Sequence, residues 1–94
     1  MKGNEEFTLK IAETLKAAGH PVRIKILRLL KKGKLSVKEI HENLGLTQSE
    51  TSRHLILLKN VSVLCSSKEG NNSYYFINDK DPFIKRITKC LQHG

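Results

Sequence analysis

The chain contains 94 residues, of which 38% are hydrophobic and none is tryptophan, so it is long enough for a single domain, residues 1–94, with a modest core. Its 17 basic and 9 acidic residues give a net charge of +8, which suits a polyanionic partner, although solvated helix faces would explain the charge as well. No run of 18 apolar residues predicts a membrane span, and the first residues, MKGNEEF, lack the apolar core of a signal peptide. We therefore expect a cytoplasmic protein with no membrane partner.

The amino-terminal third predicts two amphipathic helices. Over residues 4–18, apolar side chains recur at three- and four-residue spacing, and Gly19 ends the pattern. Pro21 suits the first turn of a second helix over residues 21–32, whose broad apolar stripe indicates a central core helix. Six basic residues and no acidic one lie between positions 20 and 34, a distribution consistent with a positive field around a duplex.

Residues 36–59 predict two short helices joined by a tight turn. Ser36 with Glu39, and Thr47 with Glu50, each fit the capping-box pattern that begins a helix. Gly45 lies between the two patterns and can adopt the positive φ that ends a helix. We therefore expect helices over about 36–43 and 47–59, which together form a helix-turn-helix.

The second helix of this pair begins with small hydrogen-bonding side chains and then a cation. Such a helix start suits the major groove of DNA, where amide, hydroxyl and guanidinium groups meet base edges and phosphates. The side chains concerned are Gln48, Ser49, Thr51, Ser52, Arg53 and His54.

After residue 60 the hydrophobic pattern changes to the two-residue period of strands. Two β-rich runs flank the turn cluster KEGNN, which predicts a hairpin over about 62–78. Apolar positions at helical spacing then predict a last helix over about 79–92. The expected fold is mainly α with a β-hairpin wing, in the order α-α-α-α-β-β-α, which is a winged helix-turn-helix.

Several segments resemble the ArsR/SmtB family of bacterial winged-helix repressors. The resemblance runs from about residue 12 to residue 91 and is carried by the segments HPVRIKILRLL, LGLTQSETSRHLILL and KEGNNSYYFIN. It implies a homodimer built through the helices over 4–18 and 79–92. It also implies one fourth helix in each of two successive major grooves of double-stranded DNA, on a palindromic operator with half-sites about 34 Å apart or a multiple of that.

Carried over residue by residue, the resemblance implies a DNA-binding surface on the fourth helix and the wing. Gln48 and Ser49 are the candidates for base-edge contacts, Arg53 for a guanine or a phosphate, and His54 for a phosphate. Three structural alternatives stay open: Ser49 reinforces the helix cap, Thr51 packs against the third helix, and His54 is a half-buried ring. The complete set is Thr47, Gln48, Ser49, Ser52, Arg53, His54, Lys68, Asn71 and Asn72.

The chain departs from the family at the wing and at the turn before it. Family wings often carry arginines where this chain has Asn71 and Asn72, so Lys68 is the cation that this wing brings and its electrostatic contribution should be small. The usual Ala-Gly after the fourth helix is replaced by Val61-Ser62. We expect Asn60, which tolerates positive φ, to make the turn instead.

Neither of the family's metal sites matches the sequence. One site needs a cysteine pair around residues 35–39, which contain none, and the other begins with Asp-Xaa-His, where this chain has Asp81-Pro82-Phe83. We therefore expect no metal site and no cofactor. Cys90 continues the apolar stripe of the last helix and fits a small hydrophobe at the dimer interface. A thiol switch that uses Cys90 is the alternative.

The sequence fits two further classes of function less well. A winged-helix module for protein–protein interaction would expose apolar residues on its fourth helix, whereas this helix begins with polar ones. An enzyme would need a cluster of catalytic groups, but the four histidines are scattered and no glycine-rich phosphate loop is present. The sequence therefore favours a DNA-binding regulator that is not an enzyme.

Overall fold

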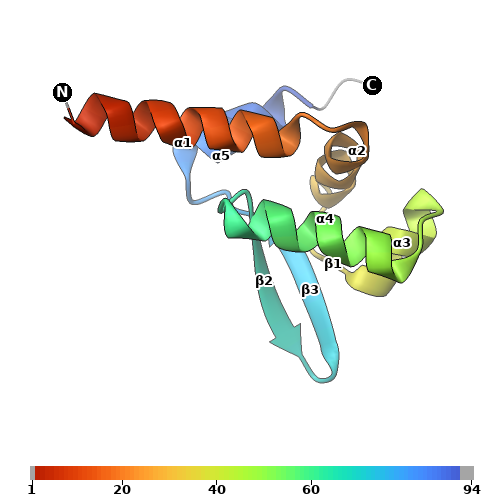
Figure 1. The fold of residues 1–94 in the computed structure, drawn as a ribbon. Helices are drawn as coiled ribbons and strands as arrows, with labels where there is room; N and C mark the ends of the chain where they lie inside the picture. Colours follow the sequence, from red (N-terminus) through yellow and green to blue (C-terminus); the bar gives the residue numbers. More distant parts are fainter. Residues whose placement is uncertain (1, 92–94) are drawn as a thin grey trace.

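The computed structural model describes residues 2–91 and shows a helical body from which a β-hairpin projects (Figure 1). α1 and α5 lie beside each other on one side of the helical body, α2 and α3 lie on the other side, and α4 runs above the hairpin in the figure. The arrangement is a winged helix-turn-helix, as predicted. The elements in chain order are α1 (Lys2–Ala18), α2 (Pro21–Leu30), β1 (Leu35–Ser36), α3 (Val37–Leu44), α4 (Gln48–Asn60), β2 (Leu64–Glu69), β3 (Asn72–Ile77) and α5 (Pro82–Lys89).

The predicted helix-turn-helix begins with a complete capping box. The Glu39 backbone N–H donates to the Ser36 hydroxyl oxygen at 3.1 Å, and the Ser36 N–H donates to the Glu39 carboxylate at 2.9 Å. Two backbone donors at the start of α3 are thereby satisfied. At its other end α3 stops at Gly45, whose φ of 67° is the left-handed conformation that the sequence predicted. The tight turn therefore follows from local chemistry.

The sheet contains a strand that the sequence did not predict. β1 pairs antiparallel with β3, opposing Leu35 to Tyr75 and Ser36 to Tyr74, and the strand order is β1-β3-β2. A two-residue strand is too short to show a period, and Ser36 also serves as the N-cap of α3. The observed order is therefore α-α-β-α-α-β-β-α, with the wing joined to the body through β1.

The prediction for the turn after α4 was wrong. Asn60 is the last residue of α4, and the positive φ, 63°, belongs to Ser62. Backbone N–H groups of Ser62 and Val63 donate to carbonyls in the last turn of α4, which places the left-handed residue two positions later than expected. The Asn78 side-chain amide donates to the Ser62 carbonyl at 3.0 Å and holds the turn against the end of β3.

One hydrophobic core connects α2, α3, α4 and the start of the wing. Ile26, Leu27, Ile40, Leu55 and Leu58 are completely buried in it. The apolar stripe predicted on α2 and the inward positions predicted on α4 thus face the same interior. Because α4 is buried along this side, its opposite side at the helix start remains at the surface.

The two terminal helices pack on each other and leave apolar surface uncovered. α1 buries Thr14, Ala17 and Ala18 against the body, while Phe7 and Leu15 are 54% and 53% exposed. α5 is shorter than the predicted 79–92, of which residue 92 lies outside the described residues. Asp81 caps α5 at Pro82, so the residues before it form a turn. Within residues 2–91, no helix is both long and apolar enough to cross a membrane.

Candidate nucleic-acid interface

The start of α4 is fixed by Thr47. The Glu50 backbone N–H donates to the Thr47 hydroxyl oxygen at 3.1 Å, and this hydroxyl in turn donates to the Glu50 carboxylate at 3.1 Å. The contact differs from a full capping box, because the carboxylate accepts from the hydroxyl of the capping residue. The first turn of α4 is therefore held rigid while its outward side chains stay available.

Five of the predicted DNA-binding residues gather at this capped helix start. Gln48, Ser49 and Arg53 are exposed and Ser52 is half-buried. Together with Thr47 and Glu50 they line one open surface hollow. We call Thr47, Gln48, Ser49, Ser52 and Arg53 the polar start of α4. It offers hydroxyl and amide groups, which both donate and accept hydrogen bonds, and one guanidinium group.

Thr51 does not belong to this surface. It lies on the inner side of α4, where it is fully buried and its hydroxyl has no hydrogen-bond partner among the described residues. The expectation that Thr51 has a packing role agrees with this position.

His54 lies one turn after the polar start and faces α2. Arg23 Nε donates to His54 Nδ1 at 3.1 Å, and the rings of His20 and His54 lie 5.0 Å apart. Burial of the ring, and then the positive charge of Arg23, hold the pKa of His54 below its ordinary value of 6.5. The ring is therefore neutral at pH 7 and, because Nδ1 accepts, carries its proton on Nε2. His54 is therefore a half-buried ring, as one of the alternatives from the sequence states. Its contact with a phosphate stays a prediction.

Arg23 is a structural residue of the site that sequence reasoning missed. Its Nη1 donates to the Ala17 carbonyl at the end of α1 at 3.1 Å, while its Nε holds His54. His20 caps α2 beside it by accepting from the Val22 N–H. One guanidinium group thus connects α1 and α2 to the middle of α4. The motif His20-Pro21-Xaa-Arg23 was the available signal, but it gave no indication of a contact 31 residues away.

The wing presents its predicted residues around a glycine turn. Lys68, Asn71 and Asn72 are exposed on either side of Gly70, which has a φ of 64°. Glu69 forms an ion pair with Lys34, whose ammonium group also lies 5.3 Å from the centre of the Tyr74 ring. This pair offsets the acidic residue of the wing and leaves the charge of Lys68 at the hairpin tip.

The residues at the family's second metal position have structural roles here. Asp81 accepts from the Phe83 and Ile84 N–H groups at the start of α5 and forms an ion pair with Lys10, and the hydrogen bond from Lys10 is the main cause that lowers the Asp81 pKa. Phe83 packs edge-on against Phe7, with ring centres 6.2 Å apart. In residues 2–91, no group of three histidine, cysteine or acidic side chains gathers as metal ligands would.

Both cysteines carry free thiols. Cys65 is half-buried in β2, and Cys90 is exposed at the end of α5, where its thiol donates to the Arg86 carbonyl oxygen at 3.4 Å. The exposure of Cys90 in the single chain suits both alternatives, an interface side chain and a thiol switch.

The sequence of the helix-turn-helix is similar to that of a known protein family. Residues 20–62 match the model of the bacterial regulatory protein, arsR family. An uncharacterized HTH-type transcriptional regulator of Methanocaldococcus jannaschii is 39% identical over 84 residues, which cover 87% of this chain and 91% of that protein. The transcriptional repressor PagR of Bacillus anthracis is 41% identical over 81 residues, which cover 85% of this chain and 79% of PagR.

Solved structures show the same fold. The crystal structure of PagR superposes with a TM-score of 0.81 and covers 93% of this chain and 98% of that one. A homodimeric winged helix-turn-helix DNA-binding domain from Mycobacterium bovis, described as a possible ArsR-family transcriptional regulator, superposes with a TM-score of 0.85 at 26% identity and covers 95% of this chain and 81% of that one. The chain therefore belongs to the ArsR family of bacterial regulatory proteins, and its function is transcriptional regulation, not enzymatic catalysis.

Proposed function

We propose that this protein is a cytoplasmic, homodimeric repressor that binds a palindromic operator in double-stranded DNA. The observation that carries the proposal is the polar start of α4, an exposed and capped set of hydrogen-bonding side chains on the second helix of a helix-turn-helix. The similarity to PagR, a transcriptional repressor, supports repression as the type of regulation. The homodimeric domain from M. bovis supports the assembly.

Within the polar start, each side chain suits a different part of the duplex. Gln48 and Ser49 stand at the exposed beginning of the helix and suit base edges in the major groove. Arg53 lies one turn later and can bind guanine through two hydrogen bonds or clamp a phosphate. Thr47 and Ser52 suit the neighbouring phosphates.

The wing and His54 contribute less in this proposal. Lys68, Asn71 and Asn72 reach the phosphates or minor groove beside the half-site, with a single cation among them. His54 is neutral and held by Arg23, so it offers a phosphate one N–H group, on Nε2, and no charge.

The proposed dimer uses the surface that α1 and α5 form together. The Phe7–Phe83 contact and the Lys10–Asp81 ion pair join α1 to the start of α5, and Phe7 and Leu15 are each more than half exposed on α1. Association with a second copy would cover these apolar side chains. A two-fold axis through this surface would place the two copies of α4 in successive major grooves.

The experiment that tests the proposal is an Arg53→Ala substitution, measured on DNA selected from a random duplex pool by the wild-type protein. We expect binding to weaken by about 1–3 kcal/mol, or about 5- to 150-fold in Kd. If Arg53 reads guanine, specificity relaxes at one base pair. If it clamps a phosphate, the loss is the same on every sequence and the salt dependence becomes shallower.

The matched control is Lys59→Ala, which removes one positive charge from the exposed far end of the same helix. It should reduce affinity far less than Arg53→Ala if the start of α4 enters the groove. Equal affinity of the Arg53→Ala and wild-type proteins for all DNA would rule out this assignment of the recognition helix.

A further inference from the structure

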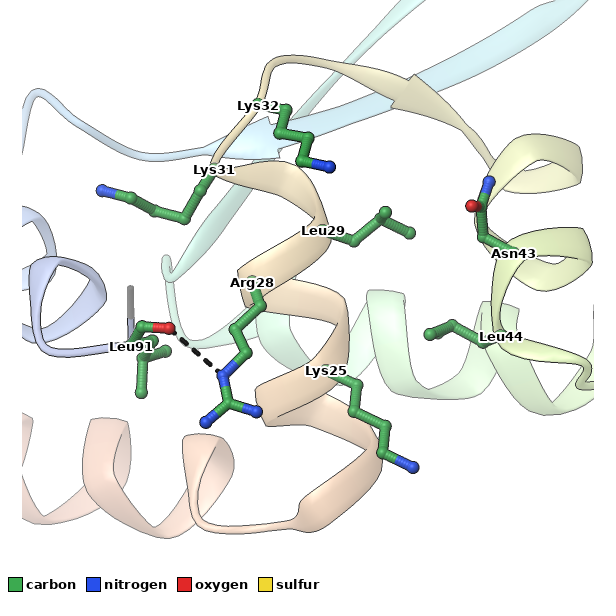
Figure 2. Close-up of a pocket in the computed structure, with 8 residues that line it drawn as sticks. All are labelled: Lys25, Arg28, Leu29, Lys31, Lys32, Asn43, Leu44 and Leu91. Carbon is green, nitrogen blue, oxygen red and sulfur yellow. Dashed lines mark hydrogen bonds between the residues drawn. The ribbon is translucent and has the colours of Figure 1, made fainter. Parts of the chain in front are cut away.

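The outer side of α2 forms one wall of a solvent-open groove on the helical body (Figure 2). The groove has a volume of about 470 Å³ and lies between α2, the end of α3 and Leu91, which is the second residue after α5. We call it the α2–α3 groove. Its lining residues are Lys25, Arg28, Leu29, Lys31, Lys32, Asn43, Leu44 and Leu91.

The lining combines positive charge with an apolar surface. Four of the eight residues are cations and none is acidic, while the three leucines supply the apolar part. Within residues 2–91, no hydrogen bond or ion pair involves the ammonium groups of Lys25, Lys31 and Lys32. No acidic side chain of the described residues neutralises these ammonium groups, and those of Lys25 and Lys32 extend on the α3 side of α2 (Figure 2), where they attract an anion.

The groove faces away from the core and from the recognition helix. At 100° per residue, Lys25 and Arg28 share one side of α2, and the buried Ile26, Leu27 and Leu30 share the other, while Lys32 follows the end of the helix. α4 packs toward that buried side, where Arg23 contacts His54. The α2 wall of the groove therefore lies on the side of α2 that faces away from α4.

A hydrogen bond within the chain holds one side of the groove in place. Arg28 Nε donates to the Leu91 carbonyl oxygen at 3.1 Å, which joins α2 to the second residue after α5 (Figure 2). On the other wall, Asn43 and Leu44 lie at the end of α3, directly before the Gly45 turn that leads to α4. The groove thus contacts the segment that positions the recognition helix.

We propose that the α2–α3 groove is a binding site for a small organic anion with an apolar portion, such as a medium-chain carboxylate. The volume lies within the range of small-molecule sites, and the leucines match an apolar body. The lysines match an acidic head group. The binding site itself does not depend on the proposed operator, because it uses a different face of the molecule.

The test is an NMR titration of the ¹⁵N-labelled protein with sodium octanoate, without DNA. We expect saturable shift changes concentrated at the backbone amides of Leu29, Asn43 and Leu44. Sodium sulfate and octanol, titrated separately, should each bind at least about tenfold more weakly, because each lacks one half of the required chemistry. Equal binding of octanol or sulfate would overturn the proposal, as would shift changes centred on Phe7 and Leu15.

A pair of double variants separates the groove from the general charge of the protein. Lys25→Gln with Lys32→Gln removes two groove cations and should raise the Kd for octanoate about tenfold. Lys38→Gln with Lys80→Gln removes two exposed lysines that do not line the groove, and should change the Kd less than about twofold. Equal weakening by both double variants would overturn the site.

Discussion

The helices α1 and α4 each leave one side uncovered by the rest of the chain, but the two sides differ in chemistry. α1 leaves Phe7 and Leu15 more than half exposed, whereas the first turns of α4 expose Gln48, Ser49 and Arg53. The free energy falls when one apolar surface covers another. Exposed polar side chains can instead form hydrogen bonds with base edges or phosphates. The difference favours a protein partner for α1 and a nucleic acid for α4.

The two surfaces are connected through Arg23. Its guanidinium group binds the last turn of α1 through Ala17 and the middle of α4 through His54. The position of the recognition helix therefore depends on a contact with the helix that carries the proposed dimer surface. A two-fold dimer needs such a connection, because the distance between its recognition helices must match the groove spacing.

The largest effect is expected from Leu15→Glu, which places a carboxylate in the proposed interface. Leu15 is 53% exposed in the single chain, so the chain should still fold. Dimerisation should weaken by about 3 kcal/mol or more, because the carboxylate would lose its hydration on association, which corresponds to more than about 100-fold in the dimer Kd. Sedimentation equilibrium measures the association, and circular dichroism checks the fold.

The control for this change is Lys16→Glu, which introduces the same carboxylate at the next position of α1, where the side chain is also exposed. It should leave the dimer Kd within a few-fold of the wild type. If Leu15→Glu were dimeric at the same concentrations as the control, the side of α1 that carries Leu15 would not be the dimer interface. The assignment of a protein partner to α1 would then be wrong.

A smaller effect is expected from Arg23→Ala, which removes the hydrogen bonds that connect α1 and α4 and leaves the exposed side chains of both helices unchanged. The change removes two hydrogen bonds from a charged donor. The free energy of unfolding should fall by about 1–3 kcal/mol. Urea denaturation at fixed protein concentration measures this loss.

Lys25→Ala is the matched control, two residues further along α2. Lys25 is exposed, so its removal should change the free energy of unfolding by less than about 0.5 kcal/mol. Equal stability of the two variants would show that the Arg23 contacts contribute nothing measurable.

Local signals made the helix-turn-helix predictable from the sequence. Ser36, Glu39, Gly45 and Thr47 act through neighbours three or four residues away, and each residue does in the structure what its type and spacing indicate. The exposure of the polar start follows from the same signals. The first residue of α4 and the buried positions Leu55 and Leu58 together determine which side of the helix faces outward.

Features that depend on distant residues were not predictable. β1 exists because β3 lies beside it, Ser62 adopts positive φ in a turn that Asn78 holds, and Arg23 reaches His54 across the core. Each joins segments 16 to about 40 residues apart. Propensity and spacing carry no information at that range.

The smallest effect concerns how the contribution of the Arg23–His54 contact to stability depends on pH. Burial and the charge of Arg23 lower the pKa of His54, with smaller contributions from His20 and Arg53, while Glu50 opposes them. Above about pH 6.5, the ring is neutral in the folded and unfolded chains and adds no pH dependence. As the pH falls below this value, the unfolded chain takes up a proton first, so stability decreases until the pH passes the lowered pKa.

Urea denaturation of wild type and His54→Gln at pH 7 and pH 5 measures this contribution. A glutamine side-chain oxygen can still accept from Arg23 but does not titrate in this range. His54→Gln should therefore lose less stability than the wild type between the two pH values. The same loss in both would mean that the proton affinity of His54 is unchanged by folding. The Arg23–His54 bond would then not depend on the neutral ring, and acid would leave the link between the α1 and α4 surfaces intact.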